Sequence, residues 1–185
     1  MTRLLLFLLL MALVITGAMA VKSCSSSPPS PPTRVDGSAL VALRDGSTLM
    51  AERGTVGREL VDWLAAEGPA SRSFELGGQE FEGRTATPTP ESLGRVSRLV
   101  AMLRANPRVK VTIIGHTDPS GDADADRALG LDRAEALAIL LRDGGVSTSR
   151  ITTESNGSSE PIAPNGSAAG RARNQRVTLI LSRKD

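Results

Sequence analysis

From about residue 72 onward, the sequence alternates between short β-branched runs and longer segments whose apolar residues recur at helical spacing. The run from Val109 to Gly115 is rich in Val, Ile and Thr, which is typical of a strand. Strands are expected at 72–76, 109–115, 150–154 and 177–181, and helices between Thr89 and Pro107 and at 124–143. A loop of Gly, Ser, Pro and Asn is expected before the last strand. This alternation predicts an α/β fold, a two-layer sandwich of the βαβαβ type.

The first residues have the features of an export signal or a membrane anchor. Arg3 precedes an uncharged apolar run from Leu4 to Val21, and Ala18-Met19-Ala20 offers the small residues of a cleavage site. The run is near the lower length limit for crossing a bilayer. Three alternatives stay open: cleavage, retention as an anchor, or lipid attachment to Cys24. Each of them places the rest of the chain outside the cytoplasm, where a single cysteine cannot form an intrachain disulfide.

Composition divides the chain into four parts. Residues 1–22 are expected to form the signal or anchor, and residues 23–34 a Ser- and Pro-rich linker that cannot bury a core. Residues 35–70 are expected to form an accessory hairpin-helix unit, and residues 71–185 the main domain. The elements of the accessory unit are strands at 39–43 and 48–50, a turn at Asp45-Gly46 and a helix capped by Thr55 and ended by Gly68. No chemistry is expected in this unit, and its Trp63 is expected in the core.

The composition argues against nucleic acid as a partner. Aromatic residues make up 2% of the chain, Tyr is absent from the sequence, and the formal net charge is only +2. A site for single-stranded nucleic acid needs stacking rings in a basic groove, and the sequence predicts neither.

The most informative polar residues stand where the strand at 109–115 meets the following helix. Asp118 closes the run Gly115-His116-Thr117-Asp118, and Arg133 interrupts an apolar helical stripe that includes Leu129 and Leu137. Loops at strand ends of α/β sheets are frequent ligand sites. A guanidinium at the edge of a core requires an anion, either a structural Asp or a carboxylate of a ligand. The residue pattern alone favours the structural partner.

The same region does not predict a metal or catalytic site. The spacing Asp122-x-Asp124-x-Asp126 resembles the opening of a calcium loop, but Arg127 and Arg133 stand where that loop needs Gly and Glu. These acids are better explained as residues that favour a helix N-terminus. His116 is the single His of a sequence that has no Gly-x-Ser-x-Gly or phosphate-loop motif. We therefore expect no metal, no cofactor and no enzymatic activity.

Several motifs follow one another through most of the main domain. They are Gly115-His116-Thr117-Asp118, Leu129-x-x-x-Arg133-Ala134, Gly145-Val146 before Arg150-Ile151, Gly157 with Pro161, and Arg171-x-Arg173-Asn174-Gln175-Arg176-Val177. In order and spacing, the chain from about Ser73 to Leu181 resembles the OmpA-like peptidoglycan-binding domain. The accessory unit also resembles the strand-turn-strand-helix lead-in of some lipoproteins of this family.

The resemblance implies a binding module for the stem peptide of peptidoglycan. The family holds the diaminopimelate residue between an Asp and an Arg, which by position are Asp118 and Arg133. A carboxylate suits the ammonium group of this ligand, and a planar guanidinium suits its carboxylate. With the resemblance, Arg133 is interpreted as a ligand residue. Thr117, Asp126 and Arg176 are expected to be supporting or rim residues.

Four positions depart from the family pattern. Asp126 stands where the family has Asn, and an ionised Asp only accepts hydrogen bonds. Gly130 replaces a Ser and is expected to loosen its helix slightly. Ser155-Asn156-Gly157 replaces a Gly-x-Gly loop, and Asn174-Gln175-Arg176 replaces Asn-Arg-Arg. We expect the fold to tolerate these changes and the affinity for the ligand to be more sensitive to them.

Together these features predict a non-catalytic envelope protein that tethers a membrane, outer or inner, to the cell wall, with its domain in the periplasm. The expected partners are peptidoglycan, the membrane through the N-terminal segment, and other envelope proteins. The alternative is a degenerate domain that serves as a protein docking module of an envelope complex. A motor stator is disfavoured because Leu4 to Val21 contains no acid to carry protons.

Overall fold

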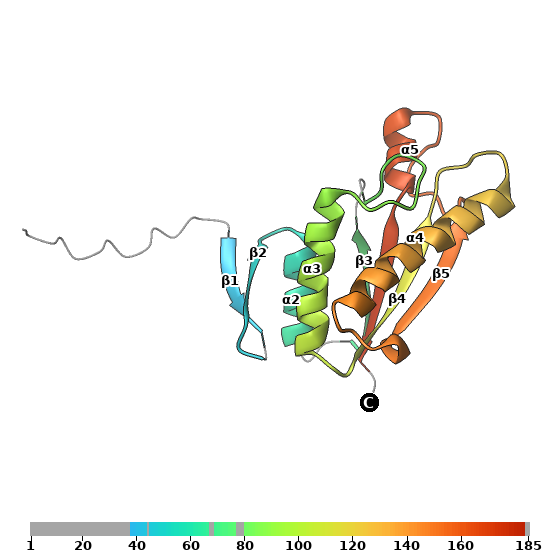
Figure 1. Ribbon diagram of the computed structural model, residues 1–185. Helices are drawn as coiled ribbons and strands as arrows, with labels where there is room; N and C mark the ends of the chain where they lie inside the picture. The colour runs from blue at the N-terminus through green and yellow to red at the C-terminus, as the bar shows by residue number, and fades with distance from the viewer. Residues whose placement is uncertain (1–37, 44, 67–68, 77–79, 184–185) are drawn as a thin grey trace, which may run out of the picture. The chain divides into compact units, whose positions relative to one another are not determined.

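The computed structural model describes residues 38–43, 45–66, 69–76 and 80–183 (Figure 1). They belong to a compact unit, Gly37–Asp185, that is distinct from Met1–Asp36. The expected leader or anchor (residues 1–22) and the expected linker (residues 23–34), which includes Cys24, lie outside the described residues. No helix within the described ranges is both long enough and apolar enough to cross a membrane.

A mixed four-stranded sheet forms the centre of the domain. Its strands are β3 (Ser71–Leu76), β4 (Val109–His116), β5 (Ile151–Gly157) and β6 (Val177–Arg183). Their order across the sheet is β3-β6-β4-β5, with β4 and β5 parallel and β6 antiparallel to both of its neighbours. The sequence predicted these four strands in an α/β fold, but it did not predict that the last strand lies inside the sheet. The short 3-10 helix η1 (Thr148–Arg150) precedes β5.

The helices α3 (Pro90–Ala105) and α4 (Ala123–Asp143) lie against the sheet (Figure 1). Thr89 caps α3 by accepting a hydrogen bond from the N–H of Ser92, as the sequence predicted. Asp122 caps α4 by accepting from the N–H groups of Asp124 and Ala125. The buried core between these helices and the sheet includes Val96, Leu99, Leu103, Val111, Ile113, Leu137, Leu141, Leu179 and Leu181.

Two glycines let α4 approach β4 closely. A Cβ atom on Gly115 would lie 1.8 Å from the carbonyl oxygen of Gly130, and a Cβ atom on Gly130 would lie 2.3 Å from Oγ of Ser155. Neither position has room for a side chain larger than hydrogen. The sequence predicted only a looser helix at Gly130, whereas the structure gives this residue a packing role. The contact sets the distance between the end of β4 and the first turns of α4.

A hairpin and a helix precede the main sheet in the chain. β1 (Ser38–Ala42) and β2 (Thr48–Glu52) form an antiparallel pair, and α2 (Val56–Ala65) follows its cap, Thr55. The hairpin and the cap were predicted. The helix ends at Ala65, before the predicted end at Gly68, which lies outside the described residues.

Trp63 joins this unit to the main domain. It is 3% exposed, and its ring meets Phe74 of β3 edge-on, with the ring centres 6.2 Å apart. The indole Nε1 donates to the carbonyl of Pro69 at 3.2 Å, so the polar edge of the ring is also satisfied. The prediction that Trp63 is a core residue is confirmed.

The helix α5 (Ala168–Asn174) occupies part of the segment that was predicted to be a loop, so that prediction was wrong here. Ser167 caps α5 by accepting a hydrogen bond from the N–H of Gly170. Asn174, which is 0% exposed, accepts from the N–H groups of Ile162 and Ala163. These bonds hold the preceding loop against the end of the helix.

Candidate functional site

The polar residues named from the sequence gather where β4 ends and α4 begins. The segment 81–88, called the strap below, belongs to the connection between β3 and α3 and reaches this end of the domain (Figure 1). A bridge between Phe81 and Pro88 closes the strap, and the N–H of Glu82 donates to the carbonyl of Thr87 at 2.9 Å. The strap is therefore a turn with its own hydrogen bonds.

Arg133 lies beneath the strap and is bound by neutral groups. Its Nε donates to the carbonyl of Thr85 at 2.9 Å, and Nη2 donates to the carbonyl of Gly83 at 2.8 Å and to Oε1 of Gln175 at 3.0 Å. Nη1 has a single, longer bond of 3.4 Å to the carbonyl of His116. One of the two N–H groups on Nη1 consequently has no acceptor in the described part of the chain.

The charge of Arg133 is not in contact with any carboxylate of the described residues. The residue is 1% exposed, and this burial, followed by the positive charge of Arg84, lowers its pKa to about 10, while Asp118 acts in the opposite direction. The Phe81 ring lies 5.0 Å from the guanidinium carbon. A structural Asp, which the residue pattern favoured, is thus not the partner of this arginine. A buried cation with only neutral acceptors favours an external anion.

The strap carries a second arginine, Arg84, which was not predicted as a site residue. Its Nη1 donates to Oδ1 of Asp118 at 2.5 Å and to the Asp118 carbonyl at 3.1 Å, and its Nη2 donates to Oδ1 of Asp126 at 2.9 Å. The Arg84 side chain is 39% exposed, against 9% for Asp118 and 1% for Asp126. Oδ2 of Asp118 has no hydrogen-bond partner among the described residues. No local spacing rule links an arginine in a loop to an acid 34 positions away, so the sequence offered no signal for this pair.

Asp126 belongs to the site and also holds the loop before α4. Its two carboxylate oxygens accept from the N–H of Ser120 at 3.1 Å and 3.0 Å. Burial raises the pKa of Asp126, but hydrogen bonds from Ser120, Ser158 and Arg84 outweigh burial and hold the pKa below its usual value. The acid is therefore ionised, and Arg84 matches the extra negative charge that this departure from the family pattern introduces.

His116 is a buried, neutral residue of β4. Its Nε2 lies 3.1 Å from Oγ1 of Thr178, and Nδ1 has no partner within the described chain. Burial is the main cause that lowers the His116 pKa to about 4; Arg176 lowers it further and Glu160 opposes the change. These features are those of a structural histidine.

Thr117 and Arg176 take different places relative to Asp118. Thr117 is 2% exposed, and its Oγ1 has no partner in the described ranges. Arg176 is 5% exposed and points to other groups: Nη1 donates to the carbonyl of Glu160 at 3.1 Å, and Nε lies 3.6 Å from Oε1 of Glu75. Thr117 therefore directly precedes Asp118 and has a hydroxyl without a partner in that part of the chain. Arg176 bonds to neither Asp118 nor Arg133 among the described residues, and it anchors the loop at Glu160.

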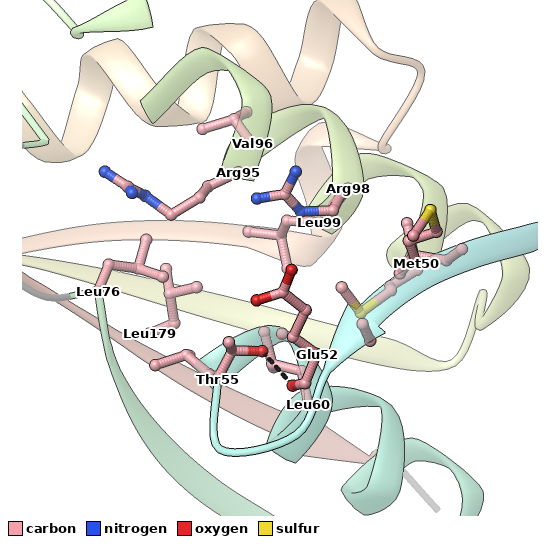
Figure 2. A pocket seen from close by; sticks show the side chains of 15 residues that line it. Met50, Glu52, Thr55, Leu60, Leu76, Arg95, Val96, Arg98, Leu99 and Leu179 are labelled. Carbon is pink, nitrogen blue, oxygen red and sulfur yellow. Dashed lines mark hydrogen bonds between the residues drawn. The ribbon is translucent and has the colours of Figure 1, made fainter. Parts of the chain in front are cut away.

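A hollow, called the groove below, has a volume of about 480 Å³ and lies between β2, α2 and α3 (Figure 2). Its apolar walls include Leu60, Leu76, Leu99 and Leu179. Figure 2 shows the guanidinium groups of Arg95 and Arg98 on the α3 side and the carboxylate of Glu52 on the facing β2 side. Arg95 also pairs with the buried Glu80 at 2.9 Å. None of the residues predicted for ligand binding lines the groove.

Comparison with known proteins identifies the class of domain. Residues 81–175 match the OmpA family, and the chain belongs to this family. It is 36% identical over 102 residues to the probable lipoprotein YiaD of Escherichia coli K12, covering 55% of this chain and 47% of YiaD, so it spans about half of that relative. It is 29% identical over 174 residues to the peptidoglycan-associated lipoprotein of Legionella pneumophila, covering 92% of this chain and 93% of the relative.

The fold is also similar to that of a solved structure. The cell wall anchor of the T6SS from Pseudomonas aeruginosa superimposes with a TM-score of 0.57 at 28% identity, covering 72% of this chain and 100% of that structure. The family match includes the strap, Asp118, Asp126 and Arg133 and ends before Arg176. Four of the five predicted site residues, Thr117, Asp118, Asp126 and Arg133, therefore lie inside the family match together with the unpredicted Arg84.

Proposed function

We propose that this OmpA-family domain binds peptidoglycan without catalysis, and that Asp118 and Arg133 hold the diaminopimelate residue of the stem peptide. Family membership supports peptidoglycan as the partner, and so do two relatives described as a peptidoglycan-associated lipoprotein and a cell wall anchor. One observation carries the diaminopimelate assignment: the buried guanidinium of Arg133 contacts only neutral acceptors. Such a cation requires an anion, and a ligand carboxylate provides one.

The free end of diaminopimelate has an ammonium and a carboxylate on one carbon atom. Nη1 of Arg133 retains an N–H for the carboxylate, and Oδ2 of Asp118 retains lone pairs for the ammonium. Hydrogen bonds between such charged groups contribute roughly 1.5–3 kcal/mol each. The two residues together select a zwitterion, whereas either one alone would bind many simple ions.

The supporting residues have separate roles in this proposal. Thr117 directly precedes Asp118 in the chain, and we assign its hydroxyl, which has no partner among the described residues, to a hydrogen bond with the ligand. Asp126 holds the loop at Ser120 and shares Arg84 with Asp118. Arg176 shapes the rim through its bond to the carbonyl of Glu160.

In the cell, we propose that the chain links a membrane to the wall. Residues 1–22 serve as signal or anchor, residues 23–34 as an extended spacer, residues 35–70 as the accessory unit and residues 71–185 as the wall-binding domain in the periplasm. At about 3 Å per residue, the spacer reaches on the order of 30 Å. Mass spectrometry of the mature N-terminus distinguishes cleavage, an intact anchor and lipid on Cys24, and thereby the outer or inner membrane.

Sedimentation with purified sacculi tests the proposed function. The wild-type chain is expected to sediment, and Asp118→Asn with Arg133→Gln is expected to lose at least about 10-fold in affinity, because two charge-assisted contacts are removed. The matched control is Asp132→Asn with Arg142→Gln, which makes the same change in charge at exposed positions of α4 and should bind as the wild type does. Equal binding of both double variants would contradict the proposed site. No soluble muropeptide should appear during the incubation, because the domain is not a hydrolase.

The chemistry of the ligand can be tested separately. A stem tripeptide with diaminopimelate should bind at least about 10-fold more tightly than the same tripeptide with lysine, which lacks the second carboxylate. Equal affinities would show that Arg133 does not receive that carboxylate, even if the domain binds the wall.

One observation favours the alternative function, a protein docking module in an envelope complex. The strap covers Arg133 and leaves it 1% exposed. If the strap never opened, the domain would retain its fold without binding the stem peptide. The wild-type chain would then fail to sediment with sacculi and would be recovered with another envelope protein.

A further inference from the structure

Arg84 and Arg133 hold the same three residues of the strap in opposite ways. Arg133 bonds the backbone on both sides of residue 84, through the carbonyls of Gly83 and Thr85. Between these two carbonyls, the side chain of Arg84 extends to Asp118 and Asp126. The backbone of the strap is therefore bound by Arg133 of α4, and the side chain of Arg84 from the strap binds the two acids.

The contact between Arg84 and Asp118 uses the chemistry that a ligand ammonium would use. A cationic N–H group donates to the carboxylate of Asp118 at 2.5 Å and is supported by a second bond to the Asp118 carbonyl at 3.1 Å. The Arg84 side chain is 39% exposed, so its ion pairs are weak enough to be exchanged in water. Nothing else among the described residues neutralises Asp118 by direct contact.

We propose that Arg84 is a built-in competitor for the ligand ammonium and thereby lowers the affinity of the site for ligands that place an ammonium at Asp118. This inference rests on the proposed function. Arg84 already occupies Oδ1 of Asp118, and a ligand ammonium on Oδ2 would place a second cation on the same carboxylate, so the two cations compete for Asp118. A ligand that carries a carboxylate without an ammonium does not meet this competition.

The competition has a measurable size. The affinity of a site that is open only part of the time is reduced by the open fraction. Two partly exposed ion pairs held by one side chain correspond to a reduction of about 10-fold. Removing the Arg84 charge while keeping a side chain of similar length should restore this factor.

Calorimetric titration with a diaminopimelate-containing stem tripeptide tests the inference. Arg84→Gln is expected to bind about 10-fold more tightly than the wild type, and Arg84→Lys should fall between them because an ammonium cannot reach both carboxylates as a guanidinium does. Arg142→Gln, an equal change in charge at an exposed position near the end of α4, should leave the affinity unchanged. Circular dichroism and the midpoint of urea unfolding check that the variants are folded.

Two single-charge probes distinguish competition from a general effect of charge. A tripeptide with lysine in place of diaminopimelate carries the ammonium alone, and a tripeptide with a pimelyl group carries the carboxylate alone. Arg84→Gln should increase the affinity for the lysine probe by about the same 10-fold and should not increase it for the pimelyl probe. The preference for the zwitterion over the lysine probe should therefore be the same in the variant and in the wild type, because the same competitor is removed for both ligands.

The outcomes separate this inference from the proposed function. If Arg84→Gln binds the tripeptide as the wild type does or more weakly, while binding still requires Asp118 and Arg133, Arg84 is not a competitor and the proposed function stands. If neither the wild type nor Arg84→Gln binds the tripeptide or sacculi, the proposed function fails, and the inference fails with it.

Discussion

The polar end of β4 and the groove differ in the side chains that form them. At the end of β4, Arg84 and Arg133 hold a short strap with hydrogen bonds and ion pairs. The groove between β2, α2 and α3 is lined mainly by apolar side chains that continue into the core, among them Leu99 and Leu179. Polar contacts can be exchanged for those of a ligand at small net cost, because each is replaced by a similar contact. Apolar contacts in the core have no such replacement, so their main effect is on stability.

The largest expected effect concerns the scaffold of the polar end. Gly115→Ala would place a Cβ atom 1.8 Å from the Gly130 carbonyl, so α4 must move away from β4. We expect the free energy of unfolding to fall by more than about 4 kcal/mol, with loss of wall binding. Urea unfolding measures the change. The matched control is Gly94→Ala within α3, where a Cβ meets no atom within 4 Å and should stabilise the helix by roughly 1 kcal/mol. A stable Gly115→Ala variant that binds sacculi would show that the glycine contact does not position the site.

The next effect concerns the groove. Leu99 is 5% exposed, and Leu99→Ala should lower the free energy of unfolding by about 3 kcal/mol because it leaves a cavity. Leu93→Ala on the same helix removes a side chain that is 43% exposed and should cost less than about 1 kcal/mol. Both folded variants should sediment with sacculi as the wild type does. Loss of sedimentation in a folded Leu99→Ala variant would show that the groove is coupled to the polar end of β4.

A smaller, pH-dependent effect is expected from His116, whose pKa is lowered to about 4 mainly by burial. The folded state takes up this proton at a lower pH than the unfolded state. The contribution of His116 to the free energy of unfolding is therefore fully present above pH 6.5 and falls as the pH decreases toward 4. The loss is at most about 3 kcal/mol. Asp126 affects stability at lower pH. Its pKa is lowered in the folded state, so its contribution to the free energy of unfolding is lost only when the pH falls below the usual pKa of an Asp. Unfolding midpoints measured from pH 7 to 4 give the slope. His116→Gln should flatten it, and an unchanged slope would assign the pH dependence to other groups.

The elements of the fold were largely predictable because their signals are local. Thr89 and Pro90 mark the start of α3, and the β-branched run after Val109 marks β4; both predictions were confirmed within a residue or two. The helix α5 was missed although Ser167 offers a cap, because its seven residues, about two turns, lie in a segment rich in Gly, Asn and Pro. A short helix carries too little periodicity to be recognised by pattern.

Local sequence patterns were enough to point to Asp118 and Arg133. Asp118 stands between a predicted strand and a predicted helix, and Arg133 interrupts the apolar stripe of that helix. Only the tertiary structure decided what these charges touch. Arg84 reaches Asp118 from 34 positions away, and Arg133 reaches the carbonyl of Gly83 from 50 positions away. Helix caps and strand runs depend on neighbours within a turn of chain, whereas the partner of a charge depends on how distant segments pack. This packing leaves the buried Arg133 without a carboxylate partner among the described residues and pairs Asp118 with Arg84.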